Sequence, residues 1–146
     1  MKKFELTSEF VTFLGKKLFR IKALVSFGDV KEGELGGLVE KEENLDQSGD
    51  AWVYGNARVY GDARVSGDAR VQNCRDYSAT SCFGSGNRTT TFFRTKDGGI
   101  SVRCGCFYGT LNEFREKVKE RHGDSRLAKE YLMLADLMEF RLSKDE

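Results

Sequence analysis

The sequence contains no proline, and it has only one histidine and one tryptophan among 146 residues. About seven prolines would be average at this length, whereas the chain has 16 glycines. Glycine must therefore form most of the turns, which predicts many residues with a positive φ angle. The absence of proline does not signal disorder, because 11 Phe and 5 Tyr with almost no net charge are typical of a folded domain.

Long apolar runs and an excess of one charge are also missing. No segment approaches the ~18–20 apolar residues of a membrane-spanning helix, and the first residues lack the apolar core of a signal peptide. We therefore expect a cytoplasmic protein whose cysteines are reduced thiols or metal ligands. Lys and Arg number 24 against 23 Asp and Glu. This balance argues against a membrane or a nucleic-acid polymer as partner.

Residues 1–34 predict an N-terminal β-hairpin. Apolar side chains alternate along two segments that are joined at Gly15-Lys16-Lys17, a sequence suited to a tight turn. A hairpin alone is only marginally stable, so we expect it to pack on another part of the chain.

Residues 35–73 contain an internal repeat of six residues. Four hexapeptides follow without a gap, and each begins with Gly-Asp or Gly-Asn and carries Ala and Val at its third and fifth positions. Both positions should point inward, as should Leu38 and Leu45 before the strict repeats. The inward set is Ala51, Val53, Ala57, Val59, Ala63, Val65, Ala69 and Val71. A strand followed by a tight turn explains this period, whereas a helix does not.

The hexapeptides resemble those of left-handed parallel β-helices, in which three repeats make one triangular coil. That resemblance implies a mixed β-helix and α+β fold. Four strict repeats make little more than one coil, and so short a solenoid leaves both ends open. The rest of the chain or further copies must cover them. We therefore expect a homo-oligomer, either a trimer or a higher, even-numbered assembly.

Residues 74–146 predict an α+β tail. Cys74–Arg88 has the composition of a loop, and two strands at Thr89–Thr95 and Ile100–Phe107 flank a turn at Lys96–Gly99. Thr110 and Glu113 form a capping box that starts one helix. Asp124 or Ser125 caps a second helix. The apolar residues that we expect to face inward on the second helix are Leu127, Tyr131, Leu134, Leu137 and Met138.

Three chemically suggestive patterns have simpler explanations. Arg58, Arg64 and Arg70 fall on successive faces of a three-sided coil, so we expect solvated surface and little effect of Arg58→Ala on binding. Cys74, Cys82, Cys104 and Cys106 offer thiols for zinc, but two thiols on a straight strand are poor chelators. The simpler explanation is that they are small buried apolar side chains behind the hairpin. Many hexapeptide proteins are acyltransferases, yet the one histidine, His122, lies at a predicted helix end.

The most informative segment runs from Phe83 to Thr91. Gly84 and Gly86 permit close approach of a backbone whose N–H groups can bind an anion. Ser85, Asn87 and Thr89 supply neutral hydrogen-bonding groups, and Arg88 and Arg103 supply charge. Phe83 and Phe107 offer rings on which a base can stack. Phosphate, ribose and a purine need this mixture. The same residues would also suit a Gly/Thr turn that leads into a hairpin.

Residues 82–142 resemble the first-described family of phage anti-Thoeris sponge proteins. The likeness lies in Phe-Gly-Ser-Gly-Asn-Arg-Thr-Thr-Thr, Lys-Asp-Gly-Gly and Val-Arg-Cys-Gly-Cys-Phe-Tyr-Gly-Thr-Leu-Asn-Glu-Phe. The resemblance implies a multimer in an infected bacterium that binds cyclic ADP-ribose isomers, and in some members cyclic oligonucleotides, without cleaving them. It implies pockets between subunits and a ligand site in the tail. The site residues it implies are Phe83, Gly84, Ser85, Asn87, Arg88, Thr89, Arg103 and Phe107.

Within that site we expect Arg88 or Arg103 to pair with phosphate, Asn87 to bond ribose or base, and Phe83 or Phe107 to stack. No cofactor and no catalysis are expected, because no residue set offers a nucleophile, a base and an orienting group at a sensible spacing. Two alternatives remain at this point. One is an oligomeric interaction protein that inhibits a host defence enzyme by contact, and the other is a hexapeptide acyltransferase.

Overall fold

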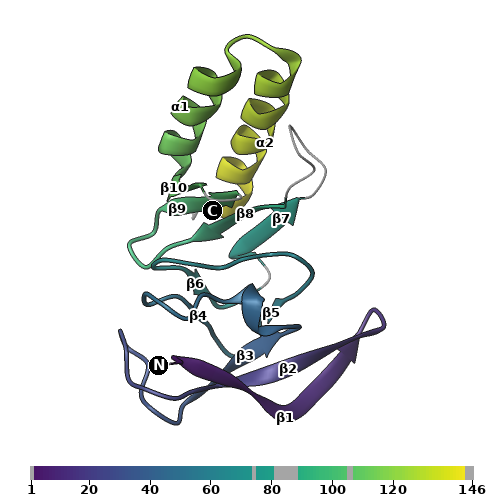
Figure 1. The fold of residues 1–146 in the computed structure, drawn as a ribbon, viewed down its shortest axis with the longest axis vertical. Coiled ribbons are helices and arrows are strands. Elements are labelled where there is room, and N and C mark those ends of the chain that lie inside the picture. The colour runs from purple at the N-terminus through teal and green to yellow at the C-terminus, as the bar shows by residue number, and fades with distance from the viewer. Residues whose placement is uncertain (1, 74, 81–88, 105–106, 144–146) are drawn as a thin grey trace.

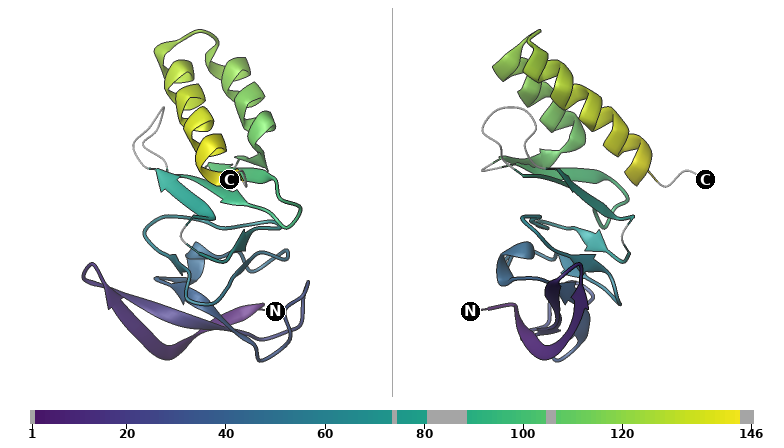
Figure 2. Two further views of the ribbon diagram at one scale, coloured as in Figure 1. Left: turned by 180° about the vertical axis from the view of Figure 1, so that it is seen from behind. Right: turned by 90° about the vertical axis from the view of Figure 1, so that its right-hand side faces the viewer.

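The chain forms successive layers along its longest axis, from an N-terminal hairpin through the repeat and a second sheet to a pair of helices (Figures 1 and 2). This computed structural model describes residues 2–73, 75–80, 89–104 and 107–143. The architecture is mixed α/β, with the helices at the C-terminal end. None of the helices in these described ranges is long and apolar enough to cross a membrane.

The N-terminal hairpin forms as the sequence predicts. β1 (Phe4–Phe13) pairs antiparallel with β2 (Lys16–Ala23), and the turn passes through Leu14 and Gly15, whose φ angles are 53° and 78°. β2 also pairs with β3 (Leu35–Val39), and β3 pairs in parallel with β5 (Arg58–Val59). The hairpin is thus one half of a four-stranded sheet that reaches into the repeat.

The repeat folds into short strands in small parallel pairs. Besides β5 it contains the 3-10 helix η1 (Glu42–Asn44), β4 (Trp52–Val53) and β6 (Arg70–Val71). Val39 pairs with Val59, Leu45 with Val65, and Val53 with Val71, so each partner lies 18 or 20 residues further along the chain. A complete β-helix is not shown.

The inward positions of the repeat are confirmed. All four Val and all four Ala side chains, with Leu38 and Leu45, are buried in the described structure. The glycines that begin the repeats, Gly49, Gly55, Gly61 and Gly67, have φ angles between 57° and 75°. As the sequence predicts, glycines with positive φ angles therefore form the turns of the repeat.

The tail sheet has four strands where the sequence predicts two. Its order is β10-β9-β8-β7, all antiparallel. The strands are β7 (Tyr77–Thr80), β8 (Thr90–Arg94), β9 (Ile100–Cys104) and β10 (Phe107–Thr110). The expectation of one strand over Ile100–Phe107 is wrong, because Phe107 pairs back onto Cys104. The sequence did not predict β7, because this strand is stabilised by its pairing with β8 and not by the composition of its own residues.

Both helices begin where their capping residues predict. Thr110 accepts a hydrogen bond from the Glu113 backbone and starts α1 (Leu111–His122), and Ser125 does the same for α2 (Arg126–Leu142). The inward face of α2 was predicted in part: Tyr131, Leu134 and Met138 are buried. Leu127 is only half-buried. Leu137 is 55% exposed, because it lies beside the buried stripe and not within it.

The tail sheet is packed on both faces. Phe92 and Val102 lie in a core with the helices, whereas the neighbouring Phe93 lies in the core of the repeat. Direct bonds join the repeat to the sheet: the Lys96 N–H donates to the Asp68 carbonyl at 2.9 Å, and the Arg64 N–H donates to Thr91 Oγ1 at 3.0 Å. These bonds and the shared core fix the tail against the repeat.

Candidate functional site: cavities on both faces of the tail sheet

The structure separates two of the predicted site residues. Arg103 projects from β9 towards the repeat, where its Nη1 donates to Ser66 Oγ at 2.8 Å. Phe107 projects from β10 towards the helices, and its ring centroid lies 5.9 Å from that of Phe114. Since the two side chains are on opposite faces of one sheet, they do not line a common cavity within one chain.

The other predicted site residues fall near or within an interval that is not described. Phe83, Gly84, Ser85, Asn87 and Arg88 lie outside the described residues, whereas Thr89 is half-buried immediately before β8. Cys74, Cys82 and Cys106 of the possible zinc set lie outside them too. Cys104 is a free thiol and accepts a hydrogen bond from Thr90 Oγ1 at 3.2 Å. No cluster of three potential metal ligands occurs among the residues that the structure describes.

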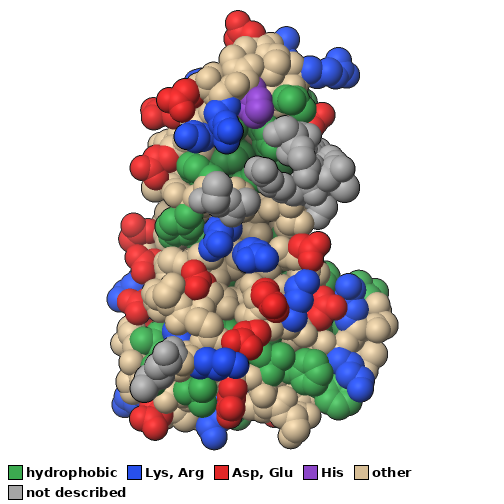
Figure 3. All heavy atoms as spheres, in the orientation of Figure 1, with side chains coloured by type: hydrophobic (Ala, Val, Ile, Leu, Met, Phe, Trp, Pro, Cys, Tyr) green, Lys and Arg blue, Asp and Glu red, His purple; other side chains and the backbone are tan. Residues whose placement is uncertain are grey.

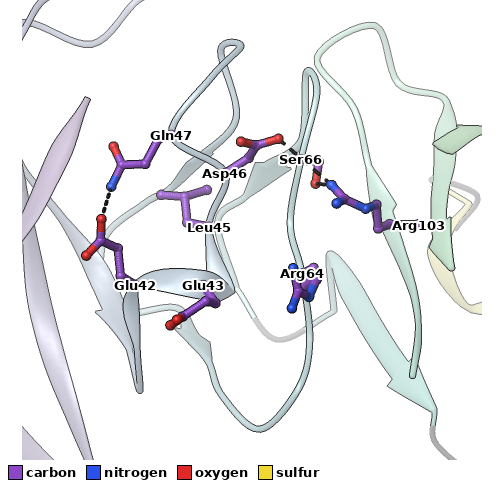
Figure 4. A pocket seen from close by; sticks show the side chains of 8 residues that line it. All are labelled: Glu42, Glu43, Leu45, Asp46, Gln47, Arg64, Ser66 and Arg103. Carbon is purple, nitrogen blue, oxygen red and sulfur yellow. Dashed lines mark hydrogen bonds and ion pairs between the residues drawn. The ribbon is translucent and has the colours of Figure 1, made fainter. Parts of the chain in front are cut away.

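Arg103 lines a cavity of about 390 Å³ between the repeat and the tail sheet, here called the Arg103 pocket (Figure 4). Its walls come from η1 and the residues after it, from the third repeat and from β9. The lining residues are Glu42, Glu43, Leu45, Asp46, Gln47, Arg64, Ser66 and Arg103.

The charges of the Arg103 pocket do not favour a phosphate ligand. Glu42, Glu43 and Asp46 line the cavity together with the two arginines, and Glu42 is paired with Lys2 Nζ at 3.3 Å. Asp46 Oδ2 lies 3.9 Å from Arg103 Nη1, so part of the guanidinium charge is already balanced. With Glu42 paired to Lys2, the carboxylates of Glu43 and Asp46 balance the two guanidinium groups, so the cavity offers an anion no excess of positive charge.

Thr89 lines a second cavity of about 530 Å³, here called the Thr89 pocket. It lies where the tip of β1, the second and third repeats, β7 and the end of α2 come together. The lining residues are Phe13, Arg58, Tyr60, Gly61, Asp62, Ala63, Tyr77, Ser78, Ala79, Thr89 and Arg141. This volume falls within the range of small-molecule sites.

Two arginines approach the Thr89 pocket from different elements. The Arg58 guanidinium lies 4.7 Å from the centroid of the Phe13 ring, a cation–π contact that orients it. Arg141 Nε donates to Ser78 Oγ at 2.8 Å. Among the described residues one carboxylate, that of Asp62, lines the cavity, and it is paired with Lys41 Nζ at 3.0 Å. The positive charge of the arginines therefore exceeds the uncompensated negative charge.

Aromatic and hydroxyl groups complete the Thr89 pocket. The rings of Phe13 and Tyr60 pack edge to face with centroids 5.3 Å apart, and Tyr77 adds a third ring. Ser78 and Thr89 add hydroxyl groups. Guanidinium groups for phosphate, rings for a base and hydroxyls for ribose are thus present around one cavity.

Sequence reasoning missed the arginines of this pocket. Arg58 was expected to be solvated surface, and it is exposed. It nevertheless lines the Thr89 pocket, so the expectation that Arg58→Ala has little effect on binding is replaced below. Nothing in the sequence around Arg141 indicated a ligand site, because α2 contacts β7 only in the folded chain. Arg70 is half-buried and pairs with Asp29 at 2.7 Å.

Phe107 lines a third and much smaller cavity of about 60 Å³ between the helices and the sheet. His122 is the last residue of α1, as predicted, and it also lines this cavity. Its ring stacks on that of Tyr131 at 5.8 Å. So small a cavity holds a few waters and not a nucleotide.

The face of the molecule seen in Figure 3 does not present one sign of charge. Figure 3 shows acidic and basic side chains interspersed over the face in view.

No protein-family model matches the chain, and no curated protein matches its sequence. The assignment of function therefore depends on the chemistry of the cavities and on the motifs of the tail.

Proposed function

We propose that the protein binds and sequesters a cyclic nucleotide signal of the cyclic ADP-ribose type, or a cyclic oligonucleotide, without cleaving it. The ligand site is the Thr89 pocket together with the chain segment that precedes Thr89. On this proposal the protein is an anti-defence sponge of a phage, acting in the cytoplasm of the infected bacterium. Cofactors and nucleic-acid polymers play no part.

The observation that carries the proposal is the lining of the Thr89 pocket. Arg58 and Arg141 supply charge to the same cavity as the rings of Phe13, Tyr60 and Tyr77. Arginine suits a phosphate because its planar fork reaches two oxygens at once. Thr89 follows directly in sequence from Phe83–Arg88, the segment in which the resemblance to sponge proteins is densest.

Sequestration needs tight binding and no reactive groups. At micromolar concentrations of a signal, useful sequestration needs a dissociation constant near or below ~10 nM, about −11 kcal/mol. Charge-assisted contacts and base stacking in this pocket can supply this free energy. Arg103 and Phe107 line other cavities of the chain, so they would add to this pocket only from a second subunit.

We further propose that the repeat is a short left-handed β-helix and that the protein assembles as a homo-oligomer. The residues that pair in parallel are separated by 18 or 20 positions in the sequence. Three hexapeptides, the length of one β-helix coil, contain 18 residues. A single coil has open ends, and the hairpin and the tail sheet each lie against one of them (Figure 1). Further copies would cover what these two elements leave exposed.

Titration calorimetry with a cyclic ADP-ribose isomer tests the site. Arg58 and Arg64 occupy the same position in consecutive repeats and both are exposed, but only Arg58 lines the Thr89 pocket. Removing a charge-assisted contact costs roughly 1.5–3 kcal/mol. Arg58→Ala and Arg141→Ala should therefore each weaken binding about ten- to a hundredfold, and Arg64→Ala should leave it unchanged.

The opposite effects of the variants on binding would place the ligand in a different cavity. If Arg64→Ala and Arg103→Ala weakened binding while Arg58→Ala did not, the ligand would lie in the Arg103 pocket. Conversion of the ligand would indicate an enzyme that acts on the cyclic nucleotide. Absence of binding to any cyclic nucleotide would favour the protein that inhibits a host enzyme by contact.

A further inference from the structure

A buried ion pair lies where the repeat, β7 and α2 meet. Arg94 Nη1 donates to Asp76 Oδ1 at 2.8 Å, and the two side chains are 18% and 5% exposed. Arg94 belongs to β8, and Asp76 directly precedes β7. Charges that are removed from water in this way must be paired and hydrogen-bonded. The other bonds that the two residues make therefore show which elements the pair holds together.

The carboxylate of Asp76 joins the end of the repeat to β7. Its Oδ2 accepts hydrogen bonds from the backbone N–H groups of Gln72 at 2.8 Å and Asn73 at 3.3 Å. The Asp76 carbonyl accepts a further bond from the Arg94 N–H at 2.9 Å. Two residues further along the chain, β7 contributes Ser78 to the wall of the Thr89 pocket. Asp76 thus fixes this wall against both the repeat and β8.

The guanidinium of Arg94 joins the end of α2 to the same point. Its Nε donates to the Leu142 carbonyl, and its Nη2 donates to the Ser143 carbonyl at 3.0 Å. Carbonyls in the last turn of a helix lack partners within the helix, and the helix dipole favours a cation beside them. Leu142 directly follows Arg141, whose Nε donates to Ser78 at the Thr89 pocket. Arg94 therefore holds the helical turn that carries a pocket arginine.

We infer that Asp76 and Arg94 are positioning residues of the Thr89 pocket, which hold the last turn of α2 against β7 and so fix the Arg141 guanidinium in place. Helix ends fray, and a long side chain on a frayed turn has more rotamers to lose when a ligand binds. Ordering Arg141 before the ligand arrives lowers this cost and tightens binding. The inference rests on the proposed function, because it concerns the same site.

Hydrogen exchange without ligand tests whether Arg94 holds the end of α2. Arg94→Lys retains the positive charge, but an ammonium cannot reproduce the planar fork that reaches Asp76 and two carbonyls at once. The amides of the last turn, among them the Ser143 N–H that donates to the Glu139 carbonyl, should exchange several-fold faster than in the wild type.

Arg115→Lys is the matched control. Arg115 Nη2 also pairs with α2, at 2.8 Å from Asp136 and 2.6 Å from Glu139. These are bonds to side chains and not to the carbonyls at the end of the helix. Arg115→Lys should therefore leave both the exchange of the last turn and the binding of ligand unchanged.

Calorimetry with a cyclic ADP-ribose isomer separates positioning from a general loss of structure. Arg94→Lys should weaken binding about three- to tenfold in the wild-type background. It should have no effect in the Arg141→Ala background, because no pocket arginine is then left on α2 to be positioned. Asp76→Asn keeps an acceptor oxygen for the repeat but loses the charge opposite Arg94, and it should act in the same way.

Two results would overturn the positioning role. One is an equal loss of affinity in the wild-type and Arg141→Ala backgrounds, which indicates a general effect on structure. The other is exchange at the end of α2 that Arg94→Lys leaves unchanged. Either failure would leave intact the binding by the wild type and its weakening by Arg141→Ala. A wild type that binds no cyclic nucleotide would instead overturn the proposed function, and the positioning role with it.

Discussion

Lys3 is held in surroundings that oppose its charge. Its Nζ donates to the carbonyls of Ala51 at 2.8 Å and Gly49 at 3.2 Å, and it lies 4.7 Å from the centroid of the Phe27 ring. Burial lowers the pKa of Lys3 from 10.5 to about 8, and the nearby Asp46 and Asp50 oppose that shift only in part. The first residues of the chain are thus bound to the start of the strict repeats by a partly desolvated amine.

This shift predicts a dependence of stability on pH. Between pH 8 and 10.5 the amine of Lys3 is protonated in the unfolded chain and increasingly neutral in the folded one. The unfolded state then binds more protons, so the free energy of unfolding rises with pH. Lys3→Met removes the amine. In urea titrations across this range, the stability of the wild type should rise relative to that of Lys3→Met.

The difference between the two proteins isolates Lys3 from the other lysines, tyrosines and cysteines that titrate in the same range. If the two stabilities changed in parallel between pH 8 and 10.5, Lys3 would ionise as it does in water, and its burial in the folded protein would be contradicted.

Among the elements, the contact between the repeat and the tail sheet decides how the layers are placed. Gly67 lies under Tyr108 of β10, so that a Cβ on residue 67 would overlap the tyrosine hydroxyl. The Tyr108 ring stacks on Phe93 with centroids 6.3 Å apart. Gly61 occupies the same position one repeat earlier, and a Cβ there would meet nothing within 4 Å.

Gly67→Ala and Gly61→Ala therefore form a matched pair. Both glycines have positive φ angles, 64° and 68°, so each alanine should cost roughly 1–2 kcal/mol of backbone strain. Gly67→Ala should cost roughly 0.5–1.5 kcal/mol more, since it also displaces the half-exposed Tyr108 ring from its stacking on Phe93. Chemical denaturation measures both. Equal losses would mean that the repeat and β10 are not in contact at this point.

Elements with a local signal were predictable. The period of the repeat identified the buried Val and Ala positions, and Thr110 and Ser125 located the starts of the helices. β7 was not predictable, because its pairing with β8 is a tertiary contact across residues that read as a loop. The division of residues 100–110 into β9 and β10 was missed for a similar reason, since alternation continues from one strand to the other in sequence.

At the scale of the whole molecule, the candidate site could be predicted only in part. Thr89 was expected at a ligand site and lines a cavity. Arg58 and Arg64 have the same local sequence, and only the packing of β1, β7 and α2 around the second and third repeats distinguishes them. Arg103 and Phe107 are close in sequence but lie on opposite faces of the sheet. A site assembled from residues 13 to 141 has no signature within any one segment.

The central claim is that the whole protein holds a cyclic nucleotide without altering it. The most direct measurement incubates the protein with a cyclic ADP-ribose isomer, removes the unbound ligand, denatures the protein by heat and identifies by mass what is released. We predict release of the intact ring in proportion to the protein, with less retained by Arg58→Ala and the same amount by Arg64→Ala. Recovery of a linear or otherwise modified product, or of no ligand after incubation with any cyclic nucleotide, would contradict the account.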